Sequence, residues 1–309
     1  MRILFHDLTV EPESWLSVLR EAFPEADIRI WQPGAPQADY ALVWAPPQQL
    51  LDEQPRLKAL FHIAAGVDAL LKLRLPAGVP IFRLDDAGMA VQMAEYVSHG
   101  LIRHFREFAR IESDTRAGRW QQLTPRLRAD FPVGVMGLGV LGQRVLKTLA
   151  AFDFPLRGWS RTPHAIAGVQ TFSGPQGLSD FLAASRVLVN LLPLTPETEN
   201  ILNKDTLGQL QPGGYLINVA RGRHLVDEDL LALLDSGHLA GATLDVFRQE
   251  PLPAGHAFWR DARITVTPHT SARTLREESL AQIVAKMGAL QAGASPESLG
   301  GHVRAQVGY

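Results

Sequence analysis

The chain has 309 residues, more than one hydrophobic core usually holds, so two domains are expected. It is 46% apolar and 20% charged with a formal net charge of −2, which gives no support for a broad nucleic-acid-binding or membrane-binding surface. The absence of cysteine excludes disulfides and thiolate chemistry. No apolar run is long enough to cross a bilayer, and MRILFHDLTV turns polar too soon for a signal peptide, so a cytoplasmic location is expected.

The first third of the chain is predicted to alternate short strands with helices, as parallel β/α layers do. A strand is expected at residues 3–5. A helix is expected at 12–23, where Trp15, Leu16 and Leu19 fall on one face. Three further apolar runs read as strands, at 38–44, 57–63 and 79–84.

A longer helix is predicted from residue 89 to 117 and ends before Gly118. Its apolar residues repeat at helical spacing and are interpreted as core: Met93, Val97, Leu101, Phe105 and Phe108. Because this helix precedes a glycine motif that opens the next sheet, it is the expected connector between domains.

The glycine motif is a G-x-G-x-x-G made by Gly137, Gly139 and Gly142, with Val140 and Leu141 between the last two. An apolar strand at 133–136 precedes it, and an amphipathic helix at 140–151 follows it. In this context the first glycine permits a tight turn, the second lets a pyrophosphate approach the backbone, and the third lets helix pack on strand. The phosphates then meet the positive end of the helix. The motif predicts a dinucleotide site.

The next strand, 155–164, lacks the acidic residue that usually binds the adenosine ribose of NAD. It offers Ser160, Arg161 and Thr162 instead. A guanidinium and two hydroxyls can bind the extra phosphate of NADP, which a carboxylate would repel. NADP(H) is therefore the predicted cofactor, with NAD(H) binding more weakly. The alternative is that Arg161 is an ordinary solvated surface arginine.

Four more strands are predicted in the second domain, at 186–192, 215–220, 241–247 and 263–269. Between two of them, 226–237 is predicted to be a helix with Asp227 as its N-cap and Gly237 after its end. A final helix is expected at 271–290. Strand and helix alternate throughout, so the predicted fold class is α/β, with two doubly wound parallel-sheet domains of Rossmann-like or flavodoxin-like type and an active-site cleft between them.

Polar residues at the ends of these strands are the candidates for chemistry, because ligands of open parallel sheets bind outside the carboxyl ends of the strands. Arg221 has a planar fork that matches the carboxylate and carbonyl oxygens of a 2-oxo acid. His269 is a proton donor that titrates near neutrality, and Glu250 would orient its ring and favour the protonated form. Asp245 either braces a loop or contacts the nicotinamide ribose or carboxamide. Five other histidines are interpreted as structural: His6, His62, His99, His104 and His256.

The strings GLGVLG, NLLPLTPET, NVARG, LDVF-x-x-EP and TPH, in this order, resemble the D-isomer-specific 2-hydroxyacid dehydrogenases. Other strings are similar to the branch of that family that reduces glyoxylate and hydroxypyruvate: YALVW-x-PP, AAGVDAL, FRLDDAGM, WSRT and the terminal GY. The resemblance implies a substrate-binding domain made of both chain ends, 1–95 with 275–309, and a central Rossmann-like dinucleotide-binding domain, 96–274. It also implies catalysis by Arg221, Glu250 and His269. No metal is expected.

The same resemblance implies the roles of several further residues. Backbone N–H groups of the loop 64–68 would hold the substrate carboxylate, at Ala65, Gly66 and Val67. Pro193 and Val219 match positions that line the cofactor in relatives. Trp44 walls the substrate pocket or belongs to the core. A homodimer is implied, with the long helix at its interface.

The function predicted from these features is the NADPH-dependent reduction of small 2-oxo acids, glyoxylate to glycolate and hydroxypyruvate to D-glycerate. One alternative keeps the mechanism and changes the substrate to another small 2-oxo acid. Another is a non-catalytic binding protein that senses NAD(P)H. The retained Arg221, Glu250 and His269 argue against that second alternative.

Overall fold

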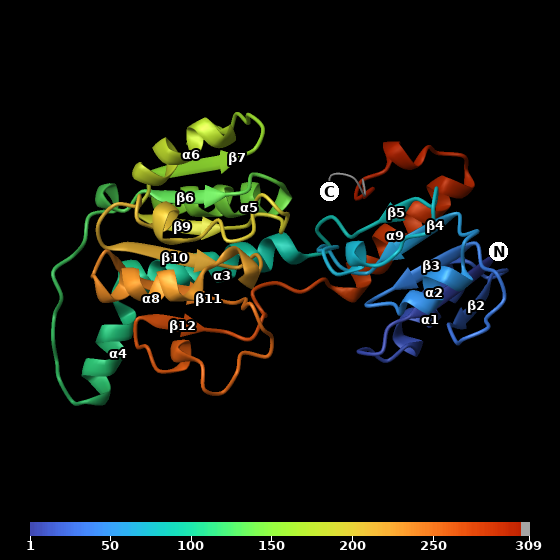
Figure 1. The fold of residues 1–309 in the computed structure, drawn as a ribbon, viewed down its shortest axis with the longest axis horizontal. Helices are drawn as coiled ribbons and strands as arrows, with labels where there is room; N and C mark the ends of the chain where they lie inside the picture. Colours follow the sequence, from blue (N-terminus) through green and yellow to red (C-terminus); the bar gives the residue numbers. More distant parts are fainter. Residues whose placement is uncertain (304–309) are drawn as a thin grey trace. The chain divides into compact units, whose positions relative to one another are not determined.

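Two parallel β-sheets carry the fold, each in a unit of its own (Figure 1). The computed structural model describes residues 1–303, so the terminal GY lies outside the described residues. The split unit comprises residues 1–88 and the chain from Thr274 on, and the central unit comprises Met89–Arg273. The predicted domain boundary between residues 95 and 96 falls inside the first helix of the central unit, α3 (Met89–Phe105). Both units have the predicted doubly wound, parallel architecture.

The sheet of the split unit has five parallel strands in the order β2-β1-β3-β4-β5. They are β1 (Arg2–His6), β2 (Asp27–Ile30), β3 (Tyr40–Val43), β4 (Ala59–His62) and β5 (Ile81–Phe82). Alternate side chains of β1 face opposite ways, as the pleat requires. Ile3 and Phe5 pack with α1 (Glu13–Ala22) and α9 (Arg276–Gln291). Leu4 packs on the other face, with α2 (Gln48–Glu53).

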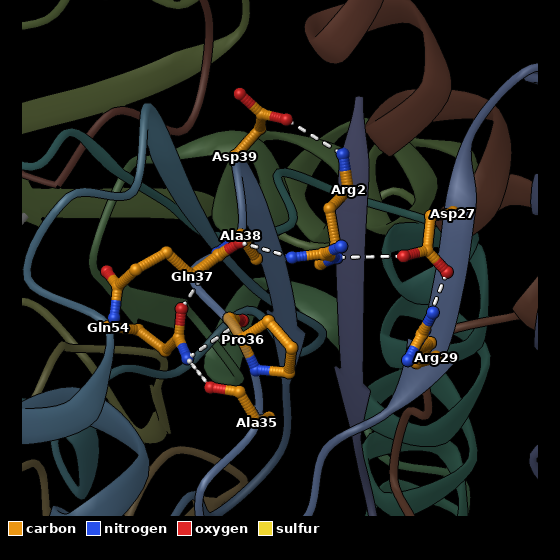
Figure 2. A network of polar contacts seen from close by, with 9 residues as sticks. All are labelled: Arg2, Asp27, Arg29, Ala35, Pro36, Gln37, Ala38, Asp39 and Gln54. Atoms are coloured by element: carbon orange, nitrogen blue, oxygen red, sulfur yellow. Dashed lines mark hydrogen bonds and ion pairs between the residues drawn. The ribbon is translucent and has the colours of Figure 1, made fainter.

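A polar network ties the first strands of this sheet together at their amino ends (Figure 2). The guanidinium of Arg2 on β1 donates to Asp27 on β2 at 2.8 Å, and the N–H of Arg2 donates to the carboxylate of Asp39 at 2.7 Å. Gln54, which is fully buried, accepts from the N–H of Ala38 at 2.9 Å and donates to the carbonyl of Ala35 at 3.2 Å. These bonds stabilise the amino edge of the sheet. Ligands of open parallel sheets bind at the opposite, carboxyl edge.

The segments that follow β3 and β4 begin next to each other at the carboxyl edge of the sheet in the split unit. The register pairs His6 with Val43, and Val43 with His62, so β1, β3 and β4 end level. Trp44 directly follows β3, and the loop 64–68 follows β4. The 3₁₀ turn η1 (Leu70–Lys72) continues from that loop and buries Leu70. The predicted substrate-binding segments of this unit therefore lie at one edge of one sheet.

The sheet of the central unit has seven parallel strands in the order β12-β11-β10-β9-β6-β7-β8. They are β6 (Val133–Met136), β7 (Leu156–Ser160), β8 (Val169–Ser173), β9 (Val187–Asn190), β10 (Gly214–Asn218), β11 (Leu239–Leu244) and β12 (Ile264–Val266). One face packs with α3 and α5 (Val140–Leu149). The other packs with α6 (Gly174–Ala183), α7 (Lys204–Leu207) and α8 (Asp227–Asp235). Figure 1 shows helices on both faces of this sheet.

The order of strands reverses at β6, which lies between β9 and β7. The register pairs Met136 with Trp159 on β7 and with Asn190 on β9. The turns after these three strands therefore begin at the same edge. A reversal of this kind opens a crevice at the carboxyl ends of the strands, where dinucleotides bind.

The predicted single helix 89–117 is wrong, because the helix breaks after Phe105. A second helix, α4 (Phe108–Arg116), follows, and Glu107 between them has a left-handed backbone with φ 53°. The carboxylate of Glu107 pairs with Arg126 at 3.1 Å, across the break. Helix α4 buries none of its residues, so Phe108 is only half-buried and is not part of the core. Gly118, with φ 70°, follows the end of α4, as predicted.

The prediction that Asp227 caps α8 is also wrong. Val226 is the N-cap and makes no side-chain hydrogen bond, while Asp227 is the first helical residue. Its carboxylate lies 3.4 Å from Nε2 of His256. Burial raises the pKa of Asp227, and the neighbouring His256 acts against that shift. The last helix, α9, begins at Arg276 and not at residue 271.

Within residues 1–303, no helix is long and apolar enough to cross a membrane. The same part of the chain contains no group of three or more His, Cys, Asp or Glu side chains that could hold a metal ion.

Candidate active site and cofactor site

The glycine turn after β6 is built so that two of its three glycines cannot be replaced. Gly137 has φ 99°, and a Cβ there would lie 2.8 Å from the carbonyl oxygen of Leu191. A Cβ on Gly142 would lie 1.9 Å from the carbonyl oxygen of Gly137, because helix α5 packs directly on the turn. These are the turn and packing roles expected of the first and third glycines.

Gly139, the second glycine, faces open space. No atom lies within 4 Å of the position that its Cβ would take. It is the N-cap of α5, and no side chain caps that helix end. Val140 beside it is 56% exposed, and Leu141 is half-buried. An accessible helix start with uncapped N–H groups fits the pyrophosphate of a dinucleotide.

The turn after β7 carries the residues predicted to select NADP(H). Arg161 and Thr162 are exposed, whereas Ser160 is buried, and its hydroxyl donates to the carbonyl of Thr162 at 2.7 Å. His164 closes the turn, with Nδ1 3.0 Å from both the Ser160 hydroxyl and the Thr162 carbonyl. Ser160 therefore shapes the turn that presents Arg161, and its direct contact with the cofactor stays a prediction.

The charge of Arg161 also acts on a carboxylate that lies outside this turn. A hydrogen bond from Thr195 lowers the pKa of Glu197, and the positive charge of Arg161 acts in the same direction. Glu197 belongs to the loop after β9 and is exposed. It therefore lies within electrostatic reach of Arg161.

A buried polar cluster supports the turns after β9 and β10. Asn190 donates to Asn218 at 3.0 Å and contacts Nδ1 of His224 at 3.0 Å. His224 in turn lies 3.2 Å from the carbonyl of Pro193, so the cluster holds the start of the loop that is predicted to line the cofactor. All three polar side chains are fully buried. Val219, the other predicted lining residue, is 4% exposed between the same turns.

The turn that carries Arg221 is fixed on both sides. Nη1 of Arg221 donates to the carbonyl of Ala220 at 2.7 Å, and the carbonyl of Arg221 accepts from Asn218 at 3.2 Å. A Cβ on Gly222 would lie 1.8 Å from the backbone of Phe247. The Arg221 turn is thus pressed against the segment that follows β11.

Glu250 and His269 form the predicted pair. One carboxylate oxygen of Glu250 lies 2.7 Å from Nδ1 of His269, and the other accepts from the N–H of Phe247 at 2.9 Å. Because a carboxylate only accepts, Nδ1 carries the donated hydrogen, which leaves Nε2 to exchange a proton with a ligand. The side chains are 45% and 36% exposed for His269 and Glu250, so a substrate can reach them.

His269 has a left-handed backbone with φ 50°, which is uncommon for a residue other than glycine. Asp245 holds it there. The carbonyl of Asp245 accepts from the N–H of His269 at 2.9 Å. Its buried carboxylate accepts from the Thr267 hydroxyl and from the N–H groups of Thr270 and Ser271, at 2.5, 2.9 and 2.8 Å.

The loop that carries His269 is also tied to helix α3. The hydroxyls of Tyr96 and Thr267 lie 2.5 Å apart. Burial raises the pKa of Tyr96 to about 12, while the Thr267 contact acts against that shift. Of the two roles considered for Asp245 in the sequence analysis, the structure shows the contacts that brace a loop. Its contact with the nicotinamide ribose or carboxamide stays a prediction.

In the split unit, the loop 64–68 has backbone donors without acceptors. No residue in the described chain accepts a hydrogen bond from the N–H of Ala65, Gly66 or Val67. Ala65 and Gly66 are half-buried, whereas Val67 is fully buried in the core. A ligand therefore reaches Ala65 and Gly66 more readily than Val67. Trp44, at the same edge, is 37% exposed.

Sequence reasoning missed the residues that support the site. Asn190 and Asn218 are the last residues of buried strands, and a polar residue at that position is the signal that could have found them. His224, three residues after Arg221, and Tyr96, within an apolar helix, had no comparable signal.

Comparison with known proteins identifies the family. Residues 99–271 match the family model described as D-isomer specific 2-hydroxyacid dehydrogenase, NAD binding domain. The chain belongs to the D-isomer-specific 2-hydroxyacid dehydrogenases. Among curated relatives, glyoxylate/hydroxypyruvate reductase A of Serratia proteamaculans (strain 568) is 48% identical over 303 residues, which are 96% of this chain and 97% of the relative. The reductase of the same name from Yersinia enterocolitica is 46% identical over 97% and 98% of the two chains.

Solved structures of family members agree over the whole chain. A D-isomer-specific 2-hydroxyacid dehydrogenase from Xanthobacter autotrophicus Py2, solved with NADPH and MES, has a TM-score of 0.93 and 39% identity, and the match covers 100% and 99% of the two chains. An NADPH-dependent glyoxylate/hydroxypyruvate reductase from Sinorhizobium meliloti, solved with NADP and sulfate, has a TM-score of 0.91 and 34% identity at the same coverage. The predicted family and fold are confirmed.

Proposed function

We propose that this 2-hydroxyacid dehydrogenase reduces glyoxylate to glycolate and hydroxypyruvate to D-glycerate with NADPH. The observation that carries the proposal is the Glu250–His269 pair at 2.7 Å, held at the carboxyl edge of the sheet that also bears Arg221 and the glycine turn. The curated relatives with 46% and 48% identity are named as reductases of these two acids, which supports the substrate class. The absence of an acid after β7 supports NADPH.

The cofactor, when bound, would supply the hydride that reduces the carbonyl carbon of the oxo acid. His269 supplies the proton from Nε2 to the carbonyl oxygen, which becomes the hydroxyl of the product. Glu250 keeps the ring in the orientation that presents Nε2. The ring then takes a proton from solvent, which its 45% side-chain exposure allows.

Arg221 is proposed to bind the carbonyl oxygen and one carboxylate oxygen of the substrate through its fork. A positioned donor stabilises the charge that develops on the carbonyl oxygen as hydride arrives. In the split unit, the N–H groups of Ala65 and Gly66 are proposed to bind the substrate carboxylate, and Trp44 to cover one side of the substrate. No metal is needed in this scheme, because Arg221 polarises the carbonyl.

The proposed cofactor contacts follow the turns of the central unit. Gly139, Val140 and Leu141 are proposed to bind the pyrophosphate, and Arg161 with Thr162 the 2′-phosphate. The remaining proposed lining residues are Gly137, Gly142, Ser160, Pro193, Val219 and Asp245.

The rate of NADPH and NADH oxidation with glyoxylate, hydroxypyruvate and pyruvate tests this function. We expect NADPH oxidation with the first two acids to be fastest. Turnover with a different 2-oxo acid alone would replace the proposed substrate and keep the mechanism. Tight NADPH binding without turnover of any oxo acid would favour the NAD(P)H-sensing alternative.

Replacement of Arg161 by Asp is expected to reverse the cofactor preference. The variant loses charge-assisted hydrogen bonds to the 2′-phosphate and gains a like charge, so the Kd of NADPH should rise about 10- to 100-fold. The Kd of NADH should fall, because a carboxylate can accept from the ribose hydroxyls. Fluorescence titration measures both constants. Arg20→Asp, on the exposed face of α1, is the charge-matched control, and an unchanged NADPH Kd in Arg161→Asp would remove Arg161 from the site.

The homodimer and the cytoplasmic location stay predictions. Two features of the central unit support an interface. Helix α4 buries none of its residues, and Trp120 and Leu127, which follow it, are 93% and 67% exposed. Large apolar side chains exposed on one segment are typical of surfaces that bind another protein. The helix next to this segment, α3, is the one that the family resemblance places at the dimer interface.

A further inference from the structure

The side chain of His62 contacts the loop that is proposed to bind the substrate carboxylate. His62 is the last residue of β4 and is 3% exposed. Its Nε2 lies 3.0 Å from the carbonyl oxygen of Gly66. Because a carbonyl oxygen only accepts, Nε2 carries the hydrogen and donates. The other ring nitrogen, Nδ1, is buried without a hydrogen-bond partner in the described chain.

Burial disfavours the charged form of the His62 ring and lowers its pKa. The bond to Gly66, the charge of Asp68 and the backbone of Val43 act against that shift. The neutral tautomer with hydrogen on Nε2 has one donor, and the Gly66 carbonyl takes it. The interaction is therefore available at neutral pH and does not require a charged histidine.

This hydrogen bond acts at the most flexible residue of the loop. Glycine has no Cβ, so its backbone dihedrals have the widest range. The carbonyl of Gly66 belongs to the planar peptide between residues 66 and 67, so anchoring the oxygen fixes the orientation of that plane. Upstream, the N–H of Leu84 donates to the carbonyl of Ala64 at 3.1 Å and fixes the peptide that carries the Ala65 N–H. The plane anchored by His62 carries the N–H of Val67, and the plane anchored by Leu84 carries the N–H of Ala65. The single peptide between them carries the N–H of Gly66, so both anchors limit its orientation.

The same ring also contacts Trp44. The two rings are stacked, with centroids 5.3 Å apart and planes at 29°. The strand register pairs Val43 with His62, so Trp44 and the loop 64–68 leave the sheet at the same edge. One buried imidazole thus touches both parts of the split unit that are proposed to meet the substrate.

We propose that His62 is a positioning residue for substrate binding. Its Nε2–H fixes the Gly66 peptide, and through it the direction of the loop donors, while its ring face supports Trp44. The sequence alone assigned His62 a structural role in the core. The proposal rests on the proposed function, because it takes the loop 64–68 as the carboxylate site. It involves no contact between His62 and the substrate.

The test separates the donor from the ring with two substitutions. His62→Phe keeps an aromatic ring for Trp44 and removes the donor. His62→Gln removes the ring and keeps an N–H donor at a similar reach. The measurements are kcat and KM for glyoxylate, the Kd of oxalate as a non-reacting carboxylate, and the Kd of NADPH. Thermal unfolding is followed in parallel, and His62→Met, which has neither ring nor donor, replaces the Phe variant if that variant does not fold.

Loss of one neutral hydrogen bond is expected to raise the KM of glyoxylate and the Kd of oxalate about 3- to 10-fold in His62→Phe. The kcat and the NADPH Kd should stay within about twofold of the wild-type values, because the residues proposed to act in proton transfer and cofactor binding lie in the central unit. In His62→Gln, the oxalate Kd should recover most of the way to the wild-type value, and the loss that remains measures the support that the ring gives Trp44. A structural role alone would not produce this separation of KM from kcat or the recovery with Gln.

Other results would overturn the proposal. These are an oxalate Kd unchanged in His62→Phe, equal losses in the Phe and Gln variants, or a parallel fall of kcat and NADPH affinity. The matched control is His6→Phe, since His6 is also buried and packs edge-on against a tryptophan, Trp31, at 5.5 Å. A wild-type protein that neither reduces an oxo acid nor binds oxalate would instead contradict the proposed function itself.

Discussion

His269→Asn is expected to lower kcat for glyoxylate about 10²- to 10⁴-fold, the usual contribution of a general acid. Asparagine is chosen because it tolerates the left-handed backbone that His269 adopts, with φ 50°. It keeps a polar group that can contact Glu250 and lacks a nitrogen that can give up a proton at neutral pH. The variant therefore removes the proton donor with little disturbance of the loop.

The decisive comparison for His269 is between turnover and cofactor binding. The Kd of NADPH should be unchanged in His269→Asn, because the side chain of His269 is not among the proposed cofactor contacts. His99→Ala, at an exposed histidine of α3, serves as the control for removal of an imidazole. Stopped-flow measurement of one turnover separates the chemical step from product release. A single-turnover rate equal to that of the wild-type protein would assign the proton to another donor.

The strands that form the site could be predicted because they are buried on both faces. Such strands are continuous apolar runs that end at polar turn residues, so β6 was predicted with its observed bounds, 133–136. Two edge strands, β2 and β8, have the sequences DIRI and VQTFS and are partly exposed. They lack an apolar run, so neither of them was predicted.

The break between α3 and α4 could not be read from periodicity. Phe108 follows Phe105 by three residues and continues the apolar pattern for one more turn. At the break, Glu107 has a left-handed conformation and forms an ion pair with Arg126, which lies after α4 in the chain. A contact of that kind is visible only in the folded structure.

The same distinction divides the residues of the site. Arg221, Glu250 and His269 could be proposed from sequence because each follows a strand and has a side chain suited to the reaction. The contacts of Asn190 with Asn218, and of His62 with Gly66, depend on register and on the path of a loop. Neighbouring sequence does not determine either of them.

Arg221→Gln is expected to lower kcat/KM for glyoxylate about 10²- to 10³-fold, which corresponds to roughly 3–4 kcal/mol of transition-state stabilisation. Glutamine keeps a donor of similar length and removes the charge and the fork. Arg221→Lys keeps the charge and removes only the fork, so it should recover part of the activity. A kcat/KM that falls from the wild-type enzyme to Arg221→Lys and again to Arg221→Gln would show that both the charge and the geometry of the guanidinium contribute.

The structure predicts that this loss arises at the reacting atoms and not from collapse of the turn. Arg221→Gln removes the bond from Nη1 to the carbonyl of Ala220. The bond from Asn218 to the carbonyl of Arg221 and the packing of Gly222 on the backbone of Phe247 do not involve the guanidinium and still hold the turn. Thermal unfolding and the NADPH Kd of Arg221→Gln should therefore match those of the wild-type protein. Arg260→Gln, at an exposed arginine of the same unit, controls for the change in net charge. An Arg221→Gln enzyme with wild-type kcat/KM would place the carbonyl of the substrate against a different residue.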